Sequence, residues 1–237
     1  MLREKMQHRP MSRAPTCFIR HLMRDMTLEE RSMNEEQAVL EFFAQTENLS
    51  LALSVADQVD GTRQKLNNDF WLALCDRIAA SAPSWRVATT EDRNAAECLV
   101  GLHLHPAQEQ KLYLRPMLEQ QYLGDTLRIY YGLMWSAAPT PELTRLNAIH
   151  TLRDTFQTAG FKTNENYLAW QWTSYHPHRK DFLLRFSTAQ DALLNEIAGL
   201  LDDLLVKHGA AVHAANSALR EAPRSAAVSL KQLRANL

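Results

Sequence analysis

Apolar residues recur at helical spacing in the first third of the chain. Over residues 34–45 they fall three and four apart, and over residues 48–82 they form one stripe with charged residues on the opposite side. Ser32 and Glu35 make a capping box before the first stretch, and Asn48 is a suitable cap for the second. We therefore expect two helices, the second of which lies on a core and has a weak point at Gly61.

After Pro83 the apolar pattern changes from helical to alternating. The clearest alternation covers residues 126–135, where leucine, isoleucine and aromatic side chains take one face. Similar alternation predicts four more strands, at residues 85–89, 97–105, 111–118 and 166–175. Pro106 and Gly124 fall between strands, so an antiparallel meander is the expected pairing.

Two further helices are predicted in the second half of the chain. Thr140 is placed to cap one that ends at Gly160, and Ser187 or Thr188 to cap a leucine-rich one that ends at Gly209. The order of elements predicts an α+β fold, in which an antiparallel sheet of about four to five strands is packed by long N-terminal, middle and C-terminal helices.

The two ends of the chain differ from its middle in composition. Residues 1–32 are rich in arginine and interrupted by prolines, which favours a flexible basic leader or a spurious start over a transit peptide or a nucleic-acid-binding arm. Residues 33–222 are expected to form a single α+β domain. The polar, basic residues 223–237 are expected to be a flexible tail.

The composition of the chain limits which partners and cofactors we expect it to bind. Lys plus Arg number 26 and Asp plus Glu 27, so any contact with a polyanion must be a local patch. The three scattered cysteines lack metal-ligand spacing, which favours a cytoplasmic location. No apolar run approaches the roughly 20 residues of a membrane-spanning helix, so we expect no membrane partner. The seven glycines form neither a Walker loop nor GxGxxG, and we expect no nucleotide cofactor.

One tripeptide resembles the ExK element of metal-dependent nucleases. In Glu109-Gln110-Lys111 the carboxylate would hold Mg²⁺ and the lysine would lie beside the attacked phosphate. Asp92 is the nearby aspartate that would complete the site, but Pro106 indicates a turn before Glu109. A chance occurrence is the alternative, and we assign no catalytic residue.

Two histidine pairs are the most metal-like feature. His103 with His105 and His176 with His178 each have the spacing that shares a face in a strand, and four imidazoles would suit zinc if the pairs met. The alternative is that these histidines face solvent at a strand end and in a turn. We assign no metal ligand.

Aromatic and basic residues interleave over the predicted strands. On one sheet face they would stack on bases and contact phosphates. The alternative is that the aromatic rings pack beneath helices. The candidate nucleic-acid-binding residues are Arg115, Arg128, Tyr130, Arg179 and Lys180.

Three segments carry a resemblance to a known family. The run Lys65-Leu66-Asn67-Asn68-Asp69-Phe70-Trp71-Leu72-Ala73-Leu74, followed by Tyr130-Tyr131-Gly132-Leu133 and a leucine-rich terminal helix, resembles the C-terminal half of PD-(D/E)XK nuclease superfamily proteins of phage, prophage and defence contexts. The likeness covers roughly residues 35 to 208.

The metal-binding residues of that family lie upstream of the similar region and have no match here. The resemblance therefore implies a non-catalytic, nuclease-associated module that binds a partner protein or nucleic acid in phage, mobile-element or defence biology. Two alternatives stay open. One is a metal-dependent PD-(D/E)XK-like nuclease that uses Asp92, Glu109 and Lys111, and the other is a purely structural subunit of a protein complex.

Overall fold

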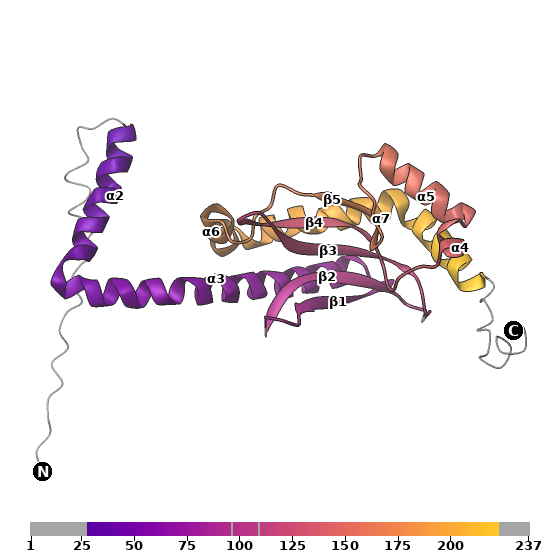
Figure 1. The fold of residues 1–237 in the computed structure, drawn as a ribbon, viewed down its shortest axis with the longest axis horizontal. Coiled ribbons are helices and arrows are strands. Elements are labelled where there is room, and N and C mark those ends of the chain that lie inside the picture. Colours follow the sequence, from indigo (N-terminus) through magenta and orange to yellow (C-terminus); the bar gives the residue numbers. More distant parts are fainter. Residues whose placement is uncertain (1–27, 96, 109, 223–237) are drawn as a thin grey trace, which may run out of the picture. The chain divides into compact units, whose positions relative to one another are not determined.

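The computed structural model describes residues 28–95, 97–108 and 110–222, which form helices and one five-stranded sheet (Figure 1). Their order confirms the predicted α+β class and the antiparallel sheet. The elements are α2 (Leu28–Ala44), α3 (Thr46–Ser81), β1 (Trp85–Asp92), β2 (Cys98–Pro106), β3 (Leu114–Leu123), β4 (Thr126–Trp135), α4 (Pro141–Thr144), α5 (Asn147–Thr158), β5 (Tyr167–Trp172), α6 (Lys180–Thr188) and α7 (Gln190–Glu221).

The chain divides into two compact units within α3. The first ends at Asp60 and the second begins at Gly61, the position that the sequence marks as a weak point. The single domain expected over residues 33–222 spans both units. Helix α2 also begins at Leu28, inside the expected leader; the rest of that leader and the expected tail lie outside the described residues.

The described part of the first unit consists of α2 and the first half of α3. Asn48, expected as a cap, lies inside α3, and its side-chain amide donates to the Phe42 carbonyl at 2.9 Å, which ties the start of α3 to the end of α2. Large apolar side chains of this unit are between 37% and 60% exposed. They are Val39, Leu40, Phe42, Leu49, Leu51, Leu53, Val55 and Val59.

In the second unit each strand pairs with its neighbours in sequence, in the order β1-β2-β3-β4-β5. Strand β3 covers Leu114–Leu123 instead of the expected 111–118. It reaches Leu123 because that residue pairs with Thr126 across a two-residue turn, in which Gly124 has a φ of 61°.

Strands β2 and β3 separate near Pro116. Their register covers three pairs, from Gly101 with Glu119 to His103 with Met117, and Pro116 comes next. Proline has no N–H for a ladder bond. Beyond it, the Leu114 backbone bonds instead to the Asn216 side chain of α7, which accepts from the Leu114 N–H at 2.7 Å and donates to its carbonyl at 2.9 Å.

The helices of the second unit pack on one face of the sheet, and α7 runs behind the strands in Figure 1. Apolar side chains from the second half of α3 and from α5, α6 and α7 join those of this face in one core. Its largest fully buried members are Trp71, Phe70, Phe156, Leu74, Ile78, Leu102, Leu104, Leu114, Leu118, Ile129 and Leu133.

Several helix ends differ from the expected ones. Two helices, α4 and α5, occupy the segment where one helix was expected from Thr140 to Gly160. Thr140 makes no side-chain cap bond. Ser187 and Thr188, expected as caps, lie inside α6. Helix α7 continues through Gly209 because the buried positions continue as far as Leu219.

Candidate functional site

The face of the sheet away from the helices, called the open face below, carries the candidate site. Every buried apolar side chain of the described helices belongs to the helix-side core, whereas Met117 and Tyr130 are buried outside it. The cross-strand register assigns the open-face side chains. They are Arg86, Ala88, Thr90, Gly101, His103, His105, Arg115, Met117, Glu119, Gln121, Arg128, Tyr130, Gly132, Met134, Tyr167, Trp170 and Trp172.

Two glycines allow the strands to approach closely on this face. A Cβ at Gly101 would lie 2.4 Å from the Leu118 carbonyl oxygen, and one at Gly132 would lie 2.1 Å from the Ala169 carbonyl oxygen. No other residue type fits at such distances. On the same face Met117 is fully buried although it lies outside the helix-side core.

A buried carboxylate is held by two tyrosines at the middle of the open face. Glu119 is 7% exposed, and its Oε2 accepts from the Tyr130 hydroxyl at 2.6 Å and from the Tyr167 hydroxyl at 3.1 Å. Burial and then the Glu119 charge raise the pKa of Tyr130, and the same causes raise the pKa of Tyr167 to about 12. Both phenols therefore stay protonated at neutral pH and serve as donors.

Aromatic rings and a guanidinium lie next to this carboxylate. The Trp170 and Trp172 ring centroids are 5.7 Å apart, and both rings pack edge to face on Tyr130. The Arg128 guanidinium lies 5.8 Å from the Trp172 centroid and donates from Nε to the Thr173 carbonyl at 2.5 Å. Both tryptophans are half-buried, and the Lys162 ammonium lies 5.4 Å from the Trp170 centroid.

Histidines and arginines occupy the β1, β2 and β3 part of the open face. His103 bonds through Nδ1 to the Thr90 hydroxyl at 2.9 Å, and His105 bonds through Nδ1 to the Tyr113 hydroxyl at 2.6 Å. Burial, followed by Arg115 and His105, lowers the pKa of His103 to about 3. His103 is thus neutral at physiological pH.

The predicted nucleic-acid-binding residues separate into two places. Arg115, Arg128 and Tyr130 share the open face, whereas Arg179 and Lys180 lie exposed at the beginning of α6. Tyr130 is 7% exposed, so its ring supports the two tryptophans instead of offering its own surface. Arg115 donates to the Met134 sulfur at 3.3 Å, and its Nε is buried without a partner among the described residues.

Two residues of the nuclease-like alternative, Asp92 and Lys111, lie toward opposite ends of β2. Asp92 pairs with Cys98 at the first residue of β2, and Lys111 follows its last residue, Pro106. Because β2 has nine residues, its two ends are about 27 Å apart. Asp92 instead accepts a bond from the backbone N–H of Asn94 at 2.8 Å, and Glu109 lies outside the described residues.

The two histidine pairs do not combine. Within the described part of the chain, no three His, Cys, Asp or Glu side chains come together as a metal site would require. His178 lies beside Tyr122 at the end of the β3–β4 hairpin, with 3.4 Å between Nδ1 and the Tyr122 hydroxyl oxygen. His103 and His105 lie elsewhere, with ring centroids 4.5 Å apart.

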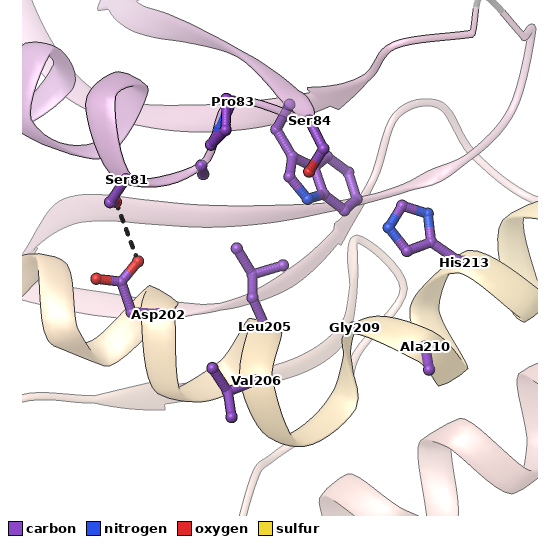
Figure 2. A pocket seen from close by; sticks show the side chains of 11 residues that line it. Ser81, Pro83, Ser84, Asp202, Leu205, Val206, Gly209, Ala210 and His213 are labelled. Atoms are coloured by element: carbon purple, nitrogen blue, oxygen red, sulfur yellow. Dashed lines mark hydrogen bonds between the residues drawn. The ribbon is translucent and has the colours of Figure 1, made fainter.

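A cleft of about 590 Å³ lies between the end of α3, the start of β1 and α7 (Figure 2). Ser81 points toward Asp202 and donates to its Oδ1 at 3.1 Å, while Trp85 stacks on His213 with centroids 5.1 Å apart. Most of the remaining lining is apolar, and Asp202 is its one carboxylate among the described residues. The cleft therefore offers few groups for a charged ligand.

Three residues of the open face were not recognised as candidates from the sequence. They are Glu119, Tyr167 and Arg86. Each makes its contacts on the open face with residues of neighbouring strands, and the sequence does not specify those neighbours. The alternation within β3 is the one signal that could have placed Glu119 on the same face as Arg115.

The chain matches no family model, no curated protein and no solved structure in comparisons with known proteins. The described helices include none with the length and apolar character that a membrane crossing requires.

Proposed function

We propose that this protein is a non-catalytic module of nuclease-like ancestry whose open face binds a single-stranded segment of nucleic acid. The observation that carries the proposal is the grouping of Trp170, Trp172 and Arg128 on the sheet face opposite the helices of the second unit. The proposal includes a cytoplasmic location and a role in phage, mobile-element or defence biology, which follow from the cysteine usage and from the family resemblance.

Stacking and charge supply the binding energy in this proposal. A base stacked on an accessible tryptophan ring contributes about 1–3 kcal/mol without sequence preference. Arg128 and Arg115 would contact phosphates beside the rings, and Arg179 and Lys180 would add attraction at the start of α6. The protein has a net charge of −1 and therefore does not attract a polyanion as a whole. Attraction to the phosphates must come from these four local cations.

The two tryptophans of the open face are rigidly supported, which favours this face as the binding surface. The two tryptophans rest on Tyr130, whose hydroxyl is fixed by Glu119. Because the rings are held before binding, little side-chain entropy is lost when a base stacks on them. Gly132 opposite Trp170 removes a side chain that would otherwise occupy the space beside the ring.

Fluorescence anisotropy with labelled single-stranded DNA and RNA at low salt tests the proposal. Trp172→Ala should weaken binding by about tenfold, as expected for one lost stacking contact. Lys207→Gln is the control, because it removes one positive charge from an exposed i,i+4 ion pair on α7. Absence of binding by the native protein, or equal binding by the Trp172 variant, would refute the proposal.

A cleavage assay with Mg²⁺ or Mn²⁺ separates the proposal from the metal-dependent nuclease alternative. That alternative expects cutting of DNA or RNA that Glu109→Ala abolishes, with Lys111 and Asp92 also required. Our proposal expects binding without cutting. Metal-dependent cutting that depends on Glu109 would replace it.

A second candidate function, a structural subunit bound to a partner protein, is favoured by the first unit. Its exposed apolar side chains include Leu51, Leu53 and Leu40, which are 58–60% exposed, and such groupings are typical of protein interfaces. If this function is correct, the protein should associate with itself or form a stable complex with a co-expressed neighbouring gene product. The double variant Leu51→Gln with Leu53→Gln should lose that association. This function also expects no retention of nucleic acid at low salt.

A further inference from the structure

A polar cavity opens where β2 and β3 separate. It has a volume of about 420 Å³, within the range of small-molecule sites. Beyond His103 the two strands no longer pair, and the segment between them folds back past His105. The cavity is lined by Arg86, His105, Pro106, Gln108, Gln110, Lys111 and Tyr113.

The lining includes side-chain donors that would suit an anion. Arg86 and Lys111 are exposed cations, and neither pairs with a described carboxylate. The Gln110 amide nitrogen is buried and makes no hydrogen bond within the described protein. A buried donor without a partner costs about 1–3 kcal/mol, which an acceptor in the cavity would relieve. No described residue that lines the cavity is acidic.

Contacts on both sides hold the cavity wall in place. Tyr113 bonds through its hydroxyl to His105 at 2.6 Å, and its backbone N–H donates to the Ser136 hydroxyl at 3.0 Å. Gln108 accepts a hydrogen bond from Arg220 of α7. A site whose walls are fixed before binding loses less entropy when the ligand enters.

Basic side chains continue from the cavity onto the open face. Arg86 lies directly opposite His105 across β1 and β2, so both residues belong to the cavity and to the open face. Burial, followed by Arg115 and Arg86, lowers the pKa of His105. Both arginines are therefore close enough to oppose a positive charge on this imidazole, and they would stabilise an anion in the same place.

We infer that this cavity, called the phosphate pocket below, binds the terminal phosphate of a nucleic-acid strand that lies on the open face. Arg86 binds the phosphate through its planar guanidinium, and Lys111 adds a second charge. The Gln110 amide donates to a phosphate oxygen. The inference rests on the proposed function, because it places the end of the same strand whose bases stack on Trp170 and Trp172.

Binding of oligonucleotides of about ten residues that differ only in the terminal phosphate tests the inference. Strands with a 5′-phosphate, with a 3′-phosphate and with neither are compared by fluorescence anisotropy at one salt concentration. One of the two phosphorylated strands should bind about tenfold more tightly than the plain strand, as expected for one charge-assisted contact. Lys111→Gln and Arg86→Gln should each remove most of this difference, and Lys207→Gln should retain it.

Inorganic phosphate distinguishes failure of the inference from failure of the proposed function. It should raise the unfolding temperature of the native protein and have no such effect on the Lys111→Gln variant. If no strand binds but this phosphate effect is present, the proposed function is wrong and the phosphate pocket takes a small phosphorylated molecule. If the plain and phosphorylated strands bind equally, or if the Lys111 variant keeps the full difference, the inference is overturned.

Discussion

Tyr130 of β4 donates its hydroxyl hydrogen to the Glu119 carboxylate of the neighbouring strand β3 at 2.6 Å. The two residues face each other in the β3–β4 register, and each is 7% exposed. A carboxylate so far from water is stable only while its acceptor capacity is used. This pair therefore satisfies the buried Glu119 oxygen and at the same time fixes the ring on which the two tryptophans rest.

Tyr130→Phe should lower the free energy of unfolding by about 1–3 kcal/mol. The substitution leaves Glu119 Oε2 with Tyr167 as its remaining tyrosine donor, at 3.1 Å. Urea unfolding at pH 7 measures the change. Tyr122→Phe is the matched control, because Tyr122 is 60% exposed and should change stability by less than about 0.5 kcal/mol. Equal stability of the two variants would show that the buried bond contributes nothing.

Gly132→Ala should destabilise the protein by about 2–3 kcal/mol. The added Cβ would lie 2.1 Å from a backbone oxygen of β5, which cannot move without breaking the ladder. Gly199→Ala is the control, because its Cβ meets nothing within 4 Å in α7 and should stabilise the helix by about 0.5–1 kcal/mol. Thermal unfolding of both variants checks the opposite signs. A Gly132 variant as stable as the native protein would contradict the close approach.

The helix-side core was predictable because it depends on local periodicity. Alternation over residues 126–135 assigns Ile129 and Leu133 to one face and Arg128 and Tyr130 to the other, and the structure places them so. The helical stripe likewise includes Phe70 and Leu74, both of which are fully buried. A pattern with a period of two or 3.6 residues specifies which face is buried without any knowledge of the partner.

The site could not be predicted to the same extent because it depends on long-range pairs. Asn216 binds the Leu114 backbone over 102 residues of sequence, and this contact is formed beyond Gly209, where the sequence suggested that α7 ends. Glu119 similarly takes its second tyrosine from a strand 48 residues away. Neither partner leaves a local signal, since spacing within one element does not specify which element pairs with it.

Because His103 is held neutral in the folded protein, the free energy of unfolding should decrease in mild acid. The folded-state pKa of His103 is about 3, below the ordinary 6.5, so the unfolded chain binds more protons between these values. The contribution of neutral His103 to the free energy of unfolding is therefore fully present above about pH 6.5 and is lost as the pH decreases toward 3. After allowance for solvent screening, the loss attributable to His103 is about 1 kcal/mol between pH 7 and pH 5.

Urea unfolding of the native protein and of His103→Asn at both pH values measures this contribution. The variant keeps a side chain that can bond to Thr90 but does not titrate, so its loss in acid should be smaller. His105, Arg115 and all carboxylates are common to both proteins and cancel in the comparison. An identical acid loss in the two proteins would show that His103 does not cause it.

Arg128→Lys should weaken binding of single-stranded nucleic acid although it conserves the charge. The native guanidinium donates to the Thr173 carbonyl and lies over the Trp172 ring at once, a geometry that an ammonium group cannot reproduce. We expect about a fivefold loss of affinity with an unchanged slope of affinity against salt, and a comparable loss with a smaller slope for Arg128→Gln. Anisotropy titrations at several salt concentrations measure both quantities. If the lysine variant binds as tightly as the native protein, Arg128 acts through charge alone and its position over Trp172 has no role in binding.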